Sequence, residues 1–91
     1  MNGKPIQKKG ITHRQLDQTE TMLYDQEMEA IHILNPTARL IWDLCNGEHT
    51  IKDMVAAIKT EFTGTEDKDI LGEVQITLDT FAEKGLLQVD S

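Results

Sequence analysis

The sequence predicts one small α+β domain of the winged helix-turn-helix type, in which three antiparallel strands precede three helices and a short terminal strand. The apolar pattern between Thr12 and Leu34 has a period of two residues, which is typical of strands. At Asn35 the period lengthens to about 3.6 residues, which is typical of helices. A chain of 91 residues is long enough for one hydrophobic core, so both patterns belong to one domain.

Three short strands are expected before residue 35. The polar stretches between them, 17–20 and 25–27, are short enough for hairpin turns, and turns this tight join antiparallel strands. The expected strands cover residues 14–17, 21–24 and 29–34.

Two helices are expected next, each with a recognisable start. Asn35 can cap the free amides of the first helix and Pro36 suits its first position, and Gly47 favours its end. The segment Thr50–Asp53 resembles a capping box that opens the second helix, which the residues 63–65 should break.

The third helix is expected from about residue 66 to Lys84-Gly85, where a cation and a glycine both suit a C-terminus. Residues 86–89 can add one short strand. Apolar residues at helical spacing predict the buried face of each helix. These are Leu40, Ile41, Leu44 and Cys45 in the first, Ile51, Met54, Val55, Ile58 and Phe62 in the second, and Ile70, Leu71, Val74, Leu78 and Phe81 in the third.

The net charge of −7 is unevenly distributed along the chain. Four basic and no acidic residues lie in the first fourteen positions, and we expect residues 1–11 to form a flexible basic tail or a weak first strand before a domain over 12–91. The rest of the chain holds five basic and sixteen acidic side chains. Such a surface repels phosphate backbones and favours a basic partner, although acidity can also serve solubility alone.

Nothing in the sequence predicts a catalytic, metal or membrane function. Cys45 is the only cysteine, so an internal disulfide is excluded, and its place on an apolar helix face favours packing over nucleophilic chemistry. His13, His32 and His49 show no metal-ligand spacing, and the chain has no glycine-rich phosphate loop. Without a signal peptide or a long apolar run, a cytoplasmic protein without cofactor or metal is expected.

The expected strand 29–34 is unusual because both of its faces are partly apolar. Ile31 and Ile33 lie on one face, while the other carries Ala30 and Leu34 on either side of His32. The strand is either buried on both sides, or it is a sheet edge that can accept an added strand. The residues alone leave both interpretations open. An edge would also allow self-pairing, so a homodimer is a further alternative.

The run Leu34-Asn35-Pro36-Thr37-Ala38, followed by Ile41-Trp42-Asp43-Leu44-Cys45-Asn46-Gly47, resembles the PqqD family. This family includes coenzyme PQQ synthesis protein D and the recognition elements for ribosomally made, modified peptides. The resemblance covers about residues 13–89 and continues through Thr50-Ile51 to Lys84-Gly85-Leu86-Leu87. Asn46 and Glu73 stand where the family commonly has Asp, and Thr77 where it is often apolar, so the particular member is left open.

The resemblance implies a non-catalytic peptide chaperone. In relatives, the leader of a precursor peptide lies antiparallel against the third strand and packs on the third helix. The bound leader is presented to a modifying enzyme, typically a radical S-adenosylmethionine (SAM) protein. The product would be PQQ or another modified peptide. Carried onto this sequence, the peptide-binding residues are Glu29, Ala30, Ile31, His32, Ile33 and Leu34 on the strand and Leu71, Gln75, Leu78, Asp79 and Ala82 on the helix. The periodicity of that helix does not fix which flank faces the groove.

A DNA-binding winged-helix regulator is the alternative function, because it would share the predicted topology. The acidic residues Glu73, Asp79 and Glu83 on the last helix argue against it, since DNA binding needs a basic surface. The sequence therefore favours a peptide partner over a nucleic acid or a membrane.

Overall fold

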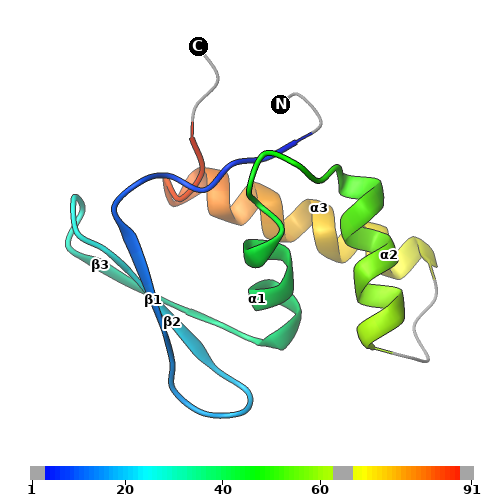
Figure 1. Ribbon diagram of the computed structural model, residues 1–91, viewed down its shortest axis with the longest axis horizontal. Helices are drawn as coiled ribbons and strands as arrows, with labels where there is room; N and C mark the ends of the chain where they lie inside the picture. The colour runs from blue at the N-terminus through cyan, green and yellow to red at the C-terminus, as the bar shows by residue number, and fades with distance from the viewer. Residues whose placement is uncertain (1–3, 63–66, 89–91) are drawn as a thin grey trace.

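A three-stranded antiparallel sheet is followed by three helices in the computed structural model, which describes residues 4–62 and 67–88 (Figure 1). This order confirms the predicted α+β fold. The sheet lies to one side of the helices, and the longest helix runs behind the other two (Figure 1). The elements are β1 (Ile11–Gln15), β2 (Thr21–Asp25), β3 (Ala30–Leu34), α1 (Pro36–Asp43), α2 (Ile51–Glu61) and α3 (Asp67–Glu83).

The sheet has the order β1-β2-β3, so β2 lies in its centre. Leu23 of β2 stands opposite His13 of β1 and His32 of β3. The predicted first strand, 14–17, was wrong by three residues at its start and by two at its end. It ends at Gln15 because Asp17 belongs to the turn that follows β1. Its carboxylate accepts hydrogen bonds from the Thr19 amide at 2.7 Å, the Thr19 hydroxyl at 2.9 Å and the Glu20 amide at 2.8 Å.

A second aspartate closes the turn between β2 and β3. The buried Asp25 carboxylate accepts from the amides of Glu27 at 3.1 Å and Met28 at 3.2 Å, and from the Lys8 ammonium at 2.8 Å. Glu29 has a left-handed backbone with φ 52°, which ends the turn. For this reason β3 begins at Ala30, one residue later than predicted.

The helix starts follow the prediction closely, and the first helix end does not. The Asn35 side chain accepts from the Ala38 amide, and Thr50 with Asp53 forms a complete capping box. Helix α1 ends at Asp43, earlier than predicted, because the next residues form a tighter turn in which the Cys45 amide donates to the Trp42 carbonyl at 3.0 Å. The predicted break at 63–65 lies outside the described residues.

One core joins the sheet to the helices. The Trp42 and Phe81 rings pack edge to face at its centre, with centroids 5.4 Å apart and an interplanar angle of 83°. Leu71 was predicted to be buried and is exposed, because the buried stripe of α3 narrows to Ile70, Val74, Leu78 and Phe81. The other buried apolar residues are Leu23, Leu34, Ile41, Cys45, Met54, Ile58, Leu86 and Leu87.

Residues 5–8 lie between the end of α1 and the segment after α3. The Gln7 amide donates to the Cys45 carbonyl, and the Lys8 amide donates to the Leu86 carbonyl, each at 2.8 Å. The predicted terminal strand, 86–89, is only an isolated bridge between Gln7 and Leu87, and residue 89 lies outside the described residues. The prediction that residues 1–11 are flexible concerns motion and stays a prediction.

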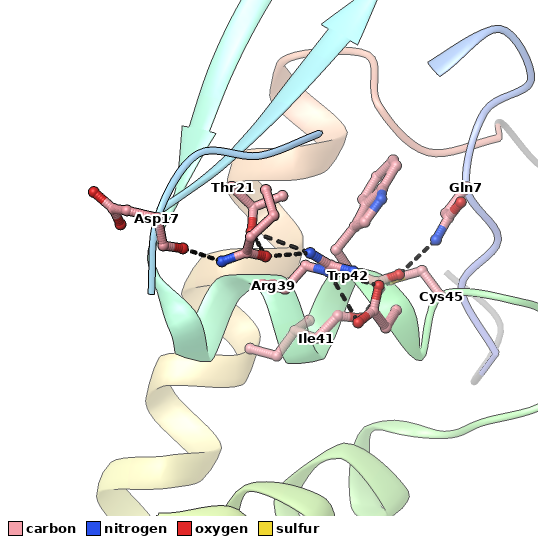
Figure 2. Close-up of polar contacts among 9 residues, drawn as sticks. Gln7, Asp17, Thr21, Arg39, Ile41, Trp42 and Cys45 are labelled. Atoms are coloured by element: carbon pink, nitrogen blue, oxygen red, sulfur yellow. Dashed lines mark hydrogen bonds and ion pairs between the residues drawn. The ribbon is translucent and has the colours of Figure 1, made fainter. Parts of the chain in front are cut away.

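A polar network attaches α1 to the hairpin of β1 and β2 (Figure 2). The Arg39 guanidinium donates to the Gln15 amide oxygen at 2.9 Å, to the Thr21 hydroxyl at 3.1 Å and to the Asp43 carboxylate at 3.0 Å. The Gln15 side chain also donates to the Asp17 carbonyl. These bonds hold α1 beside the sheet, next to the end of β3.

Candidate functional site

A groove of about 300 Å³ lies between β3 and α3. Its walls come from the strand, from the start of α1 and from one flank of α3, which are distant in the sequence and adjacent in the fold. The lining residues are Ile31, His32, Ile33, Leu34, Asn35, Ala38, Ile76, Thr77, Thr80, Phe81, Lys84 and Leu86. The prediction of a groove between the third strand and the last helix therefore has a counterpart in the structure.

The groove runs along a free main-chain edge. The Gln26 amide donates to the Gly10 carbonyl, and the Leu16 amide donates to the Glu20 carbonyl, which sets the alternation of the β1–β2 ladder. In this alternation the residues at even positions of β2 bond to β1, and those at odd positions bond to β3. It follows from the register that Ala30, His32 and Leu34 bond to β2.

Ile31 and Ile33 consequently direct their amides and carbonyls away from the sheet. No backbone hydrogen bond from the described residues 4–62 and 67–88 reaches either of them outside the strand ladder. An extended peptide laid along this edge can therefore form two donor and two acceptor bonds with the pair.

Apolar side chains surround this edge. Ile31 is 60% exposed and Ile33 is 51% exposed on the outer face of the sheet, while Leu34 faces the core. Across the groove, Ile76 of α3 is 67% exposed. The two partly apolar faces of this strand thus have different neighbours. The face with Leu34 packs on the core, and the face with Ile31 and Ile33 is open to solvent.

The wall supplied by α3 is not the predicted one. The groove is lined by Ile76, Thr77, Thr80, Phe81 and Lys84, and none of the predicted helix residues lines it. Leu78 is buried in the core. The other four lie on the opposite flank of the buried stripe: Leu71, Gln75, Asp79 and Ala82.

The physical reason is the rotation of the helix. Each residue turns an α-helix by about 100°, so the buried stripe through Ile70 and Val74 has two flanks that periodicity treats alike. Only tertiary packing decides which flank meets the sheet. One signal was present in the sequence: Ile76 is apolar, lies off the buried stripe, and shares its flank with Thr80 and Lys84 at a spacing of four residues.

The strand residues are closer to the prediction. Ile31, His32, Ile33 and Leu34 all line the groove, together with Asn35, which was not predicted. Glu29 lies in the turn and Ala30 is half-buried at the start of the strand, and neither lines the groove. Ala38 and Leu86 were also missed, because α1 and the segment after α3 approach the site only in the folded chain.

His32 is the imidazole that lines the groove. Its Nε2 atom is buried and has no hydrogen-bond partner among the described residues. Burial lowers the pKa of His32 and the Lys84 charge lowers it further, while the Asp25 carboxylate opposes them. The imidazole is therefore neutral at pH 7.

A second hollow of about 580 Å³ adjoins the groove at Lys84. It lies between the turn that precedes β3 and the C-terminal end of α3. Its lining residues are Lys8, Lys9, Glu27, Met28, Glu83, Lys84, Gly85, Leu87 and Gln88. A peptide that follows β3 past Ile31 would enter this hollow.

The remaining chemistry of the described chain is sparse. Cys45 is buried, its thiol lies 3.2 Å from the Ile41 carbonyl, and burial raises its pKa to about 12, so it is protonated and packed as predicted. Within residues 4–62 and 67–88, no three His, Cys, Asp or Glu side chains gather as metal ligands do. No helix in these ranges is long and apolar enough to cross a membrane.

Comparisons with known proteins bear on this geometry. The family described as Coenzyme PQQ synthesis protein D (PqqD) matches residues 20–87. A structure of TbiB1 in complex with the TbiA(beta) leader peptide has a TM-score of 0.79 at 19% identity and covers 94% of this chain and 98% of TbiB1.

A structure of lasso peptide synthetase B1 complexed with the leader peptide has a TM-score of 0.79 at 20% identity. It covers 94% of this chain and 99% of the synthetase chain. At these identities the likeness shows a shared fold. No curated protein matches the sequence.

Proposed function

Since the chain belongs to the PqqD family, we propose that it binds the leader of a ribosomally made precursor peptide by strand addition to β3. The observation that carries this proposal is the unpaired edge at Ile31 and Ile33, which borders an apolar groove on α3. The two structures of the same fold were solved with leader peptides bound to those proteins.

The edge and the groove supply different parts of recognition. Main-chain bonds to Ile31 and Ile33 accept any extended peptide, because every residue except proline offers the same donor and acceptor. Side chains at alternate peptide positions then enter the groove against Phe81 and Ile76, which supplies selectivity. A disordered leader loses conformational entropy on binding, so we expect an affinity of roughly micromolar order.

The role is positioning without chemistry of its own. The one thiol is buried and protonated, and the buried Nε2 atom of His32 has no hydrogen-bond partner among the described residues. The bound leader would be presented to a separate modifying enzyme, a radical SAM protein in our proposal, and the product would be PQQ or a related modified peptide.

The test uses prolines on the two edges of the sheet. Ile31→Pro removes a free-edge amide of β3, and His13→Pro removes the equivalent free-edge amide of β1, which follows from the same alternation. A leader peptide encoded beside the gene for this chain is titrated by calorimetry and followed by amide NMR shifts.

We expect Ile31→Pro to weaken leader binding by roughly tenfold to a hundredfold, because one main-chain bond is lost and the peptide carbonyl is left unpaired. His13→Pro should bind as the unmodified chain does, and circular dichroism should show both variants folded. Equal effects of the two prolines, or leader shifts confined to residues away from β3 and α3, would disprove strand addition at β3.

A further inference from the structure

Among the described residues that line the β3–α3 groove, Lys84 alone has a permanent charge. None of these described lining residues is Asp or Glu, although the chain holds sixteen of them and has a net charge of −7. The described lining of the groove is thus basic, although the chain as a whole is acidic.

The Lys84 ammonium has no ion pair with any of the described residues. The ion pairs in this part of the chain join Lys8 to Asp25 and Glu27, and Arg39 to Asp43. Lys84 stands where the groove meets the second hollow, which Lys9 also lines. A ligand that passes from one to the other must pass this cation.

The helix end beside Lys84 does not cancel its charge. The last carbonyls of a helix carry partial negative charge when they lack partners. Here the Lys84 amide donates to the Thr80 carbonyl at 3.0 Å, the Gly85 amide to Ala82 at 3.1 Å and the Leu86 amide to Phe81 at 2.9 Å. Glu83 and Glu27 line only the second hollow, and Glu27 pairs with Lys8 at 3.4 Å.

The two ends of the groove differ in chemistry. The end next to α1 is lined by Leu34, Ala38 and Ile76, and it carries no charge. The end next to the turn carries Lys84 and His32, whose buried Nε2 lacks a partner among the described residues. This polarity gives the groove a direction along β3.

Resting on the proposed function, we infer that Lys84 selects leader peptides that carry an Asp or Glu on the C-terminal side of an apolar residue. Antiparallel pairing is the more stable of the two strand orientations. A peptide antiparallel to β3 enters at Leu34 and leaves past Ile31, so its apolar residue comes first and its carboxylate second. The carboxylate forms an ion pair with the Lys84 ammonium.

The spacing follows from the geometry of the two elements. Ile76, at the apolar end, and Lys84 are separated by about 12 Å along the helix axis, at 1.5 Å per residue. An added strand advances about 3.4 Å per residue, so this span corresponds to about three to four residues. Side chains on the same face of a strand are an even number of positions apart, which places the acid two or four residues after the apolar residue.

The test is a selection from a random-sequence peptide display library, run in parallel on the unmodified chain and on three variants. Lys84→Glu reverses the charge in the groove, and Lys84→Gln removes it while keeping a similar shape. Lys52→Glu is the matched control, because Lys52 is exposed on α2, lines neither hollow, and changes the net charge by the same amount. Thermal unfolding verifies that each variant is folded.

The unmodified chain and Lys52→Glu should enrich peptides with an apolar residue followed two or four positions later by Asp or Glu. Lys84→Glu should bind these peptides about tenfold more weakly and should enrich Lys or Arg at the same position, with Lys84→Gln intermediate. The enriched peptides are then titrated against Ile31→Pro. Peptides that lose affinity for Ile31→Pro but show no charge preference would overturn the role of Lys84 and leave strand addition intact. Peptides that bind Ile31→Pro as well as the unmodified chain would overturn the proposed function itself.

Discussion

Both outer strands of the sheet pair with β2 on one side and leave their other side open, yet their surfaces differ. β1 presents polar and charged side chains, with Thr12, His13, Arg14 and Gln15 all exposed. β3 presents two exposed isoleucines, Ile31 and Ile33. Polar and charged residues on an edge discourage pairing with another chain, whereas an apolar edge invites it.

The surroundings of the two edges differ in the same way. The hollow near β1 has Gln15, Thr21 and Arg39 among its lining residues, and the side chains of these three already bond to one another. The groove beside β3 has a buried imidazole nitrogen and a lysine without a partner among the described residues. In our proposal β3 rather than β1 binds the peptide, because β3 has a second wall on α3 and polar groups nearby that have no partner among the described residues.

The largest expected effect concerns the core behind each edge. Leu34 of β3 is buried, and its truncation in Leu34→Ala should lower the free energy of unfolding by about 2–5 kcal/mol through lost contacts and a cavity. Ile11 of β1 is only partly buried, so Ile11→Ala should cost about 1 kcal/mol. Urea unfolding measures both, and equal losses would contradict the view that β3 is anchored in the core more firmly than the other outer strand, β1.

The turns at the two ends of β2 should differ in their contribution to stability, and we expect an effect of intermediate size. Asp17 and Asp25 each accept amide bonds within their turn, but Asp25 is buried and also accepts from Lys8. Asp25→Asn keeps an acceptor for the turn amides and loses the ion pair. We expect a larger fall in melting temperature for Asp25→Asn than for Asp17→Asn, because only Asp25 ties the hairpin of β3 to the N-terminal segment.

The pH dependence provides the control for this comparison. The Lys8 hydrogen bond lowers the pKa of Asp25 below its usual 3.8, assisted by the Met28 and Glu27 amides and opposed by burial. The ionised carboxylate therefore stabilises the fold above about pH 4. This contribution is lost as the pH falls through the folded pKa, so the unmodified chain and Asp25→Asn should converge in stability there. A difference unchanged from pH 7 to pH 3 would show that the ion pair is not its cause.

The sequence was sufficient for most of the fold because local chemistry determines it. The period-two pattern predicted three strands, and the caps at Asn35 and Thr50 placed two helix starts to the residue. The strand limits were less predictable. Asp17 and Glu29 take part in turns through a side-chain hydrogen bond and a left-handed backbone, which alternation alone does not reveal.

The lining of the β3–α3 groove was predictable on one side only. Residues 31–34 line the groove. Two tight hairpins place β3 at one edge of the sheet, and both hairpins were visible in the sequence, so this wall was predictable. The helix side depends on how α3 rotates against the sheet, which is set by packing between Phe81, Trp42 and their neighbours. This information is distributed over the whole core.

The smallest expected effects on stability come from substitutions on the two flanks of α3, which differ in their effect on binding. Ile76 and Leu71 are both exposed on α3, 67% and 41% respectively, so Ile76→Ala and Leu71→Ala should each change the free energy of unfolding by no more than about 0.5 kcal/mol. Their effects on binding should differ. Ile76 lines the groove and Leu71 does not, so only Ile76→Ala should weaken leader binding, by about threefold to tenfold for the lost apolar contact. Calorimetry with the leader peptide distinguishes them. A loss confined to Leu71→Ala would move the binding face to the flank of Gln75, Asp79 and Ala82, and with it the whole helix wall of the site.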